Sequence, residues 1–238
     1  MGYYWLGAFY VIETRYADAS EMFEQVTRLT PDNFTGYSNL GVSYVYQERW
    51  PEAFDALERS IAIRPSVFGI NNLATLYFFQ GRYFRAARLY EEALNLDEGN
   101  YLIWGNLGDA LYWGEEEQAP AAYRRALELA ADLRATTRDD PLLLASMALY
   151  NAMLGQEAPA LELVTDAIRL DPDDAELQLQ AAQAYQQLGR TEEAIARLRV
   201  AVGAQITPSL ISKNPWFESI QELPEFQELL PPPSRGAL

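Results

Sequence analysis

Three asparagines recur at nearly equal intervals, and they are the first residues of this chain that could recognise another molecule. They are Asn39, Asn72 and Asn106, spaced 33 and 34 residues apart. A carboxamide carries both a hydrogen-bond donor and an acceptor, so a regular row can hold an extended peptide backbone without reading its side chains. The alternative is that each amide braces a neighbouring segment of the chain's own fold. The sequence leaves both interpretations open.

A row of aromatic residues follows at the same intervals: Tyr46, Phe79 and Trp113. Large aromatic side chains often anchor protein interfaces, so these three are candidate partner contacts. They could equally pack inside the fold, because interfaces and cores have overlapping compositions. For the residues just before them (Val45, Phe78 and Tyr112), internal packing is the expectation.

The residue types exclude most catalytic chemistry. The chain contains no Cys and no His, so it can form no thiolate nucleophile, disulfide or Ser-His-Asp triad. Carboxylate clusters at residues 115–117, 139–140 and 171–174 fall in expected turns and helix starts, where helix capping accounts for them. We therefore expect no enzyme activity, no metal and no cofactor.

The charge of the chain restricts its partners. Thirty-four acidic residues against 18 basic ones give a net charge of −16, which would repel nucleic acid and anionic membrane surfaces. A neutral or basic protein or peptide is easier to accommodate, and a homodimer is not excluded. The longest apolar run, residues 3–12, is shorter than the roughly 20 residues that span a bilayer. We expect a cytoplasmic location.

Residues 37–65 show which elements would position these side chains. Tyr37, Leu40, Gly41 and Tyr44 follow the i, i+3, i+4, i+7 spacing of one helix face. Pro51 suits the first turn of a second helix, and Pro65 lies where that helix would stop. Such a helix pair cannot bury its own apolar face, so it should stack on similar pairs.

The second helix of this pair recurs six times in one register. Three columns define the repeat: a small residue, a large residue four positions later, and a mostly small residue three positions after that. The columns are Ala19, Ala53, Ala86, Ala119, Ala160 and Ala194; Phe23, Leu57, Tyr90, Tyr123, Val164 and Leu198; and Val26, Ser60, Ala93, Ala126, Ala167 and Ala201. The spacing is 33 or 34 residues, except for one interval of 41 between Ala119 and Ala160.

This pattern resembles the tetratricopeptide repeat, whose period is about 34 residues. The family's first-helix signature is matched by Tyr3, Leu6, Gly7 and Tyr10, by Tyr37, Leu40, Gly41 and Tyr44, and more loosely by Ile70, Leu73, Ala74 and Tyr77. The resemblance implies an all-α, right-handed superhelical solenoid of antiparallel helix pairs. Its six units span about residues 1–33, 34–66, 67–99, 100–139, 140–173 and 174–206.

In this family the first helices line a concave face that binds protein partners, so the resemblance implies a non-catalytic protein-interaction module. The family's carboxylate clamp needs Lys and Arg there, whereas this chain has residues such as Ser38, Asn71 and Asp109 at the matching positions. The clamp is therefore not expected. The candidate partner contacts are Asn39, Asn71, Asn72, Asn106, Asp109, Tyr46, Phe79 and Trp113.

The remaining segments are expected to close the array. Residues 207–230 should form three short capping helices that begin at Pro208, Pro215 and Pro224, and residues 231–238 should be disordered. The 41-residue interval predicts roughly two extra turns in the second helix of the fourth unit, with a restart at Asp139, Asp140 and Pro141. Because no polar capping helix comes before Tyr3, we expect another segment to precede this one.

The closing motif resembles the C-terminal repeat regions of bacterial signalling proteins that carry Ser/Thr kinase, adenylate-cyclase-like or winged-helix domains. Its residues are Asn214, Pro215, Phe217, Pro224, Phe226, Leu229 and Leu230. This likeness implies the sensory or recruiting arm of a larger signalling protein. The alternative is a stand-alone scaffold that self-associates or fills its groove with its own C-terminal segment.

Overall fold

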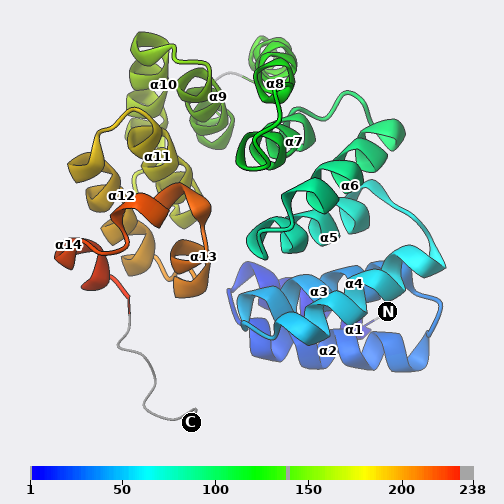
Figure 1. The fold of residues 1–238 in the computed structure, drawn as a ribbon. Helices are drawn as coiled ribbons and strands as arrows, with labels where there is room; N and C mark the ends of the chain where they lie inside the picture. Colours follow the sequence, from blue (N-terminus) through cyan, green and yellow to red (C-terminus); the bar gives the residue numbers. More distant parts are fainter. Residues whose placement is uncertain (1, 138–139, 231–238) are drawn as a thin grey trace. The chain divides into compact units, whose positions relative to one another are not determined.

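A computed structural model describes residues 2–137 and 140–230, and every regular element within them is a helix (Figure 1). The all-α class is therefore confirmed. The chain divides between Gly99 and Asn100 into two compact units. Unit 1 comprises α1 (Gly2–Ile12), α2 (Tyr16–Leu29), α3 (Phe34–Tyr46), α4 (Trp50–Ile63), α5 (Val67–Phe79) and α6 (Tyr83–Leu96).

Unit 2 continues the same pattern and adds the cap. Its paired helices are α7 (Tyr101–Trp113), α8 (Ala119–Arg134), α9 (Pro141–Met153), α10 (Glu157–Leu170), α11 (Ala175–Gln187) and α12 (Thr191–Gly203). The cap consists of α13 (Pro208–Ser212), the 3-10 helix η1 (Pro215–Ile220) and α14 (Pro224–Gln227). The three predicted proline starts are thus confirmed, although the middle element is a 3-10 helix.

The three residue columns of the second helices form the core of both units. All six alanines of the first column are at most 3% exposed, and the six large residues of the second column are at most 2% exposed. The third column is also buried throughout, from Val26 to Ala201. Periodic burial of this kind removes apolar surface from water in every helix pair, which is the main force that holds the array together.

Close approach within a pair depends on small residues in the first helix. A Cβ added at Gly41 would lie 2.6 Å from Cγ of Leu57, and one added at Gly108 would lie 2.7 Å from the ring of Tyr123. Real Cβ atoms do not tolerate such distances, so the large residue of the second helix occupies the space that glycine leaves.

The turn inside each pair requires a left-handed backbone at one equivalent position. In three pairs a glycine supplies it, with φ of 71° at Gly81, Gly155 and Gly189. In three others a larger residue adopts the same conformation: Thr14 at 55°, Glu48 at 60° and Glu115 at 58°. A residue with a Cβ is strained there, so these three turns carry a conformational cost that glycine would remove.

One detail of the fourth pair differs from the sequence-based expectation. Helix α8 ends at Arg134, five residues after Leu129, which corresponds to the last residue of α6. The extension is therefore about one and a half turns rather than two, because residues 135–137 already form a turn and a bend. The Asp140 carboxylate accepts a hydrogen bond from the Leu143 amide at 3.1 Å and caps α9 as predicted. Asp139 and the tail 231–238 lie outside the described residues.

Most large apolar side chains of the C-terminal segment are buried in the cap. Ile211, Trp216, Phe217, Ile220 and Phe226 are buried. Leu210 and Leu229 are buried as well, and Leu230 is half-buried. Leu223 is 37% exposed instead, since it lies just before α14 as its N-cap residue.

We expect Glu48→Gly to raise the free energy of unfolding by about 1 kcal/mol and Gly81→Ala to lower it by about the same amount. The reason is that both positions have φ near 60–71° in equivalent turns. Urea denaturation followed by circular dichroism would measure both changes. The control is Gly203→Ala, where an added Cβ meets nothing within 4 Å and φ is not left-handed. A Gly81→Ala variant as stable as Gly203→Ala would contradict the strain argument.

Candidate functional site

Asn39 and Asn72 occupy equivalent positions on α3 and α5 of unit 1, but their hydrogen bonds differ. Nδ2 of Asn39 donates to the Tyr4 hydroxyl at 3.2 Å and to the Thr35 carbonyl at 3.0 Å. This amide braces α3 against α1. Nδ2 of Asn72 is buried and has no hydrogen-bond partner among the described residues, although the residue as a whole is half-buried. A ligand carbonyl that reached this donor would relieve the cost of burying it unpaired.

Phe79 lies on the same face of α5 as Asn72, because residues seven apart are separated by about two helical turns. Its ring is half-buried and meets Phe78 edge-on at 5.8 Å. Asn71 precedes Asn72 and is also half-buried. We call these three residues (Asn71, Asn72 and Phe79) the α5 surface. Tyr46 has a different role, since its ring stacks on Tyr16 of α2 at 4.2 Å with an interplanar angle of 7°.

In unit 2, Asp109 of α7 is held by a tyrosine of its own helix pair. The Tyr123 hydroxyl donates to Oδ1 of Asp109 at 2.7 Å. Burial raises the pKa of the Asp109 carboxyl from 3.8 to about 7, while the Tyr123 hydrogen bond acts in the opposite direction. Burial also raises the pKa of the Tyr123 phenol, and the Asp109 charge adds to that effect. The main role of Asp109 is therefore to link α7 to α8, and it offers little charge to a partner.

Trp113, at the end of α7, is covered by the chain's own cap. Its ring meets Trp216 of η1 at 5.7 Å and 86°, and the ring of Tyr112 is parallel to Trp216 at 6.3 Å and 7°. Trp113 also packs against an apolar cluster that includes Leu149 of α9. Helices η1 and α11 both contribute residues to this cluster and contact each other. Asn106 is half-buried earlier on α7. The structure thus places the candidates in two sets, with Asn39, Asn71, Asn72, Tyr46 and Phe79 in unit 1 and Asn106, Asp109 and Trp113 in unit 2.

After Asn106, the equivalent positions of the next first helices hold other polar residues, which sequence reasoning missed. Ser146 follows Asn106 by 40 residues and Gln180 follows Ser146 by 34. The Ser146 hydroxyl donates to Oε1 of Gln180 at 3.1 Å and connects α9 to α11. A search for any hydrogen-bonding residue in this register, rather than for asparagine alone, would have found them.

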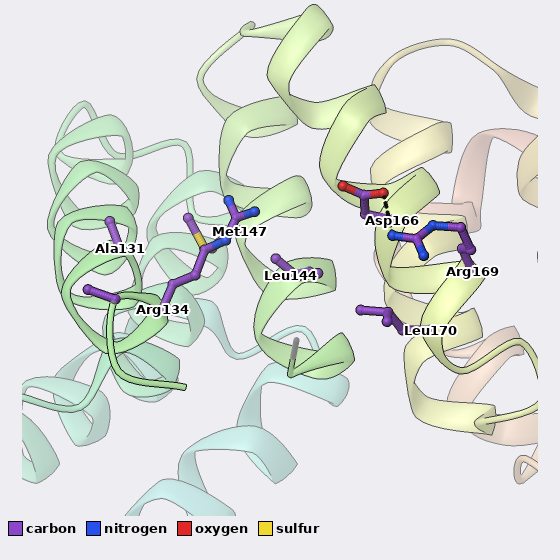
Figure 2. Close-up of a pocket in the computed structure, with 8 residues that line it drawn as sticks. Ala131, Arg134, Leu144, Met147, Asp166, Arg169 and Leu170 are labelled. Atoms are coloured by element: carbon purple, nitrogen blue, oxygen red, sulfur yellow. Dashed lines mark hydrogen bonds and ion pairs between the residues drawn. The ribbon is translucent and has the colours of Figure 1, made fainter. Parts of the chain in front are cut away.

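A cleft of ≈ 450 Å³ opens between the ends of α8 and α10 over α9. Figure 2 shows Arg134 of α8 on one side of Leu144 and Arg169 of α10 on the other, with Asp166 paired to Arg169 at 3.1 Å. Both arginines lie in the last turn of their helices, where the helix dipole favours cations. This placement explains them without a ligand. The cleft is lined by Ala131, Arg134, Ala135, Leu144, Met147, Asp166, Arg169 and Leu170.

Within residues 2–137 and 140–230 no group of three or more Asp or Glu side chains is arranged to hold a metal ion. In the same ranges no helix combines the length and the apolar character that crossing a membrane requires.

Comparison with known proteins identifies the repeats. Tetratricopeptide repeat profiles match residues 2–33, 34–99 and 153–205, which together exceed half of the chain. The chain therefore belongs to the tetratricopeptide repeat family. No curated protein sequence matches it.

Solved structures show the same fold at low sequence identity. The Cut9–Hcn1 hetero-tetramer of the APC/C matches with a TM-score of 0.64 and 15% identity over 85% of this chain and 39% of that one. This chain thus spans well under half of that relative. PilF of Pseudomonas aeruginosa matches with a TM-score of 0.58 and 17% identity, over 95% and 94% of the two chains. A thermophilic protein of the same repeat family from Thermus thermophilus has a TM-score of 0.56 and 19% identity, over 76% and 96%.

The Asp109 carboxyl should make the stability of the protein depend on pH. Because its folded pKa is about 7 against 3.8 normally, the folded state holds this proton more tightly. Its contribution to stability is complete below pH ~4 and is lost as the pH rises to about 7. Asp109→Asn should therefore stabilise the protein at pH 8 by about 1–3 kcal/mol and change little at pH 4. The full shift would be worth ~4 kcal/mol, but Asp109 keeps partial solvent contact.

Urea denaturation at both pH values would measure the difference, with the exposed Asp173→Asn as the control. Equal effects of Asp109→Asn at pH 4 and pH 8 would show that the carboxyl is not desolvated.

Proposed function

We propose that this chain recruits a protein partner by holding an extended segment of it on the α5 surface. The observation that carries the proposal is the buried Nδ2 of Asn72, which lacks an acceptor among the described residues, while the equivalent amide of Asn39 is bonded inside unit 1. Membership of the tetratricopeptide repeat family supports a protein-interaction role in general. The Asn72 amide and the Phe79 ring would then supply a backbone contact and an apolar anchor.

The charge of the chain supports a neutral or basic partner, since a net charge of −16 would repel an acidic one. The closing motif from Asn214 to Leu230 supports a role as the recruiting arm of a larger bacterial signalling protein. Nucleic acid, membrane surfaces, cofactors and intrinsic catalysis have no part in this proposal.

The test is binding of the purified chain to an array of short peptides that differ in net charge, followed by fluorescence anisotropy on the captured sequences. We expect Asn72→Ala to weaken binding about fivefold to tenfold and Phe79→Ala about tenfold or more. Added salt should weaken the binding of basic peptides.

Two control variants separate binding from folding. Asn39→Ala should lower stability by about 1 kcal/mol, because it removes the hydrogen bonds to Tyr4 and Thr35, and should leave affinity unchanged. Phe84→Ala removes an aromatic ring that is 71% exposed on α6 and should change neither. Normal binding by Asn72→Ala and Phe79→Ala would show that the α5 surface is not the site.

A second candidate function is a stand-alone scaffold that closes on itself, and one observation favours it. Trp216 of the C-terminal cap covers Trp113, one of the candidate partner contacts of unit 2. Light scattering and the peptide array together distinguish the recruiting arm from the scaffold. A monomer that captures peptides fits the recruiting arm, whereas a dimer that captures none fits the scaffold.

A further inference from the structure

The end of α7 carries an aromatic surface made by Tyr112 and Trp113, which we call the α7 aromatic surface. Trp216 reaches it from η1, about 100 residues later in the chain, and is left only 4% exposed. Its ring is parallel to Tyr112 at 6.3 Å and edge-on to Trp113 at 5.7 Å. Parallel and edge-on contacts at such separations are the favourable geometries for aromatic pairs.

The cap has other anchors besides Trp216. Phe217, Ile220 and Phe226 are at most 4% exposed in the cluster that includes Leu198 of α12. The amide of Gln186 on α11 also donates to the Ser219 hydroxyl at 3.2 Å. Trp216 is therefore a side chain that an otherwise anchored cap extends onto α7.

The contact between the two tryptophans leaves hydrogen-bonding capacity unused. Nε1 of Trp113 and Nε1 of Trp216 are both buried, and neither has an acceptor among residues 2–137 and 140–230. A buried N–H without an acceptor destabilises the arrangement that buries it. Moving Trp216 away would let both indoles bond to water or to a carbonyl of a bound segment.

We propose that the α7 aromatic surface is a docking site for a partner segment in which proline precedes an aromatic residue, and that Trp216 occupies it in the absence of that partner. The chain's own Asn214–Phe217 stretch shows which chemistry fits. Asn214 caps η1 by accepting from the Trp216 amide at 3.2 Å, and Pro215 fixes the backbone that presents the indole ring. This inference rests on the proposed function, that the chain binds segments of partner proteins, but it concerns unit 2 rather than the α5 surface.

The experiment uses the full chain and a dye-labelled peptide with the sequence of residues 212–220, alongside the same peptide with its tryptophan replaced by alanine. Fluorescence anisotropy gives the affinities. Trp216→Ala should bind the peptide at least about tenfold more tightly than the unmodified chain, since the competing indole is gone. Adding Trp113→Ala to that variant should abolish the gain. Glu218→Gln, an exposed neighbour on η1, should behave like the unmodified chain.

Circular dichroism checks that the cap of Trp216→Ala stays folded. Trp216→Leu replaces that variant if helix is lost, because leucine keeps apolar bulk without the indole. The proposal is overturned if the variant binds no better than the unmodified chain, if the alanine peptide binds equally well, or if Trp113→Ala has no effect. Normal array binding by Asn72→Ala together with the expected gain in Trp216→Ala would remove the α5 surface and leave this site standing. Loss of array binding in Asn72→Ala without a gain in Trp216→Ala would remove only this site.

Discussion

The rest of this structure depends on one contact, in which a large side chain of each second helix fills the space left by a small residue of the first. Leu57 lies against Gly41 and Tyr123 against Gly108 at distances that exclude even a methyl group. The two helices of a pair can approach closely only because of this fit. Each pair then buries one shared apolar face and leaves the outer faces of its first helix for polar and aromatic residues.

That arrangement decides what happens to the polar side chains of the first helices. A polar group at such a position must find a partner on the neighbouring helix or remain unsatisfied. Asn39 finds the Tyr4 hydroxyl, and Ser146 finds Gln180. The Asn72 donor finds none among the described residues. The same register therefore braces adjacent pairs at Asn39 and at Ser146, and the proposed partner contact is the position where the donor has no such partner.

The C-terminal cap imposes a second constraint on unit 2. A repeat array needs a closing element because its last pair would otherwise expose an apolar face. Here the cap covers that face with Phe217, Ile220 and Phe226 and also reaches back to α7 through Trp216. One segment thus both completes the core and covers aromatic residues that could contact a partner.

Sequence alone determined the all-α class, the recurring helix pairs and the columns of residues that they bury, because helical periodicity and Gly, Ala and Pro placement are local signals that the packing respects. The proline starts of the cap were readable for the same reason. The fates of Asn39, Tyr46, Asp109 and Trp113 were decided only by the tertiary structure. Each depends on a side chain from another helix: Tyr4, Tyr16, Tyr123 and Trp216 respectively. Spacing along the chain can place a residue on a helix face, but it cannot state which hydroxyl or ring the neighbouring helix will bring to it.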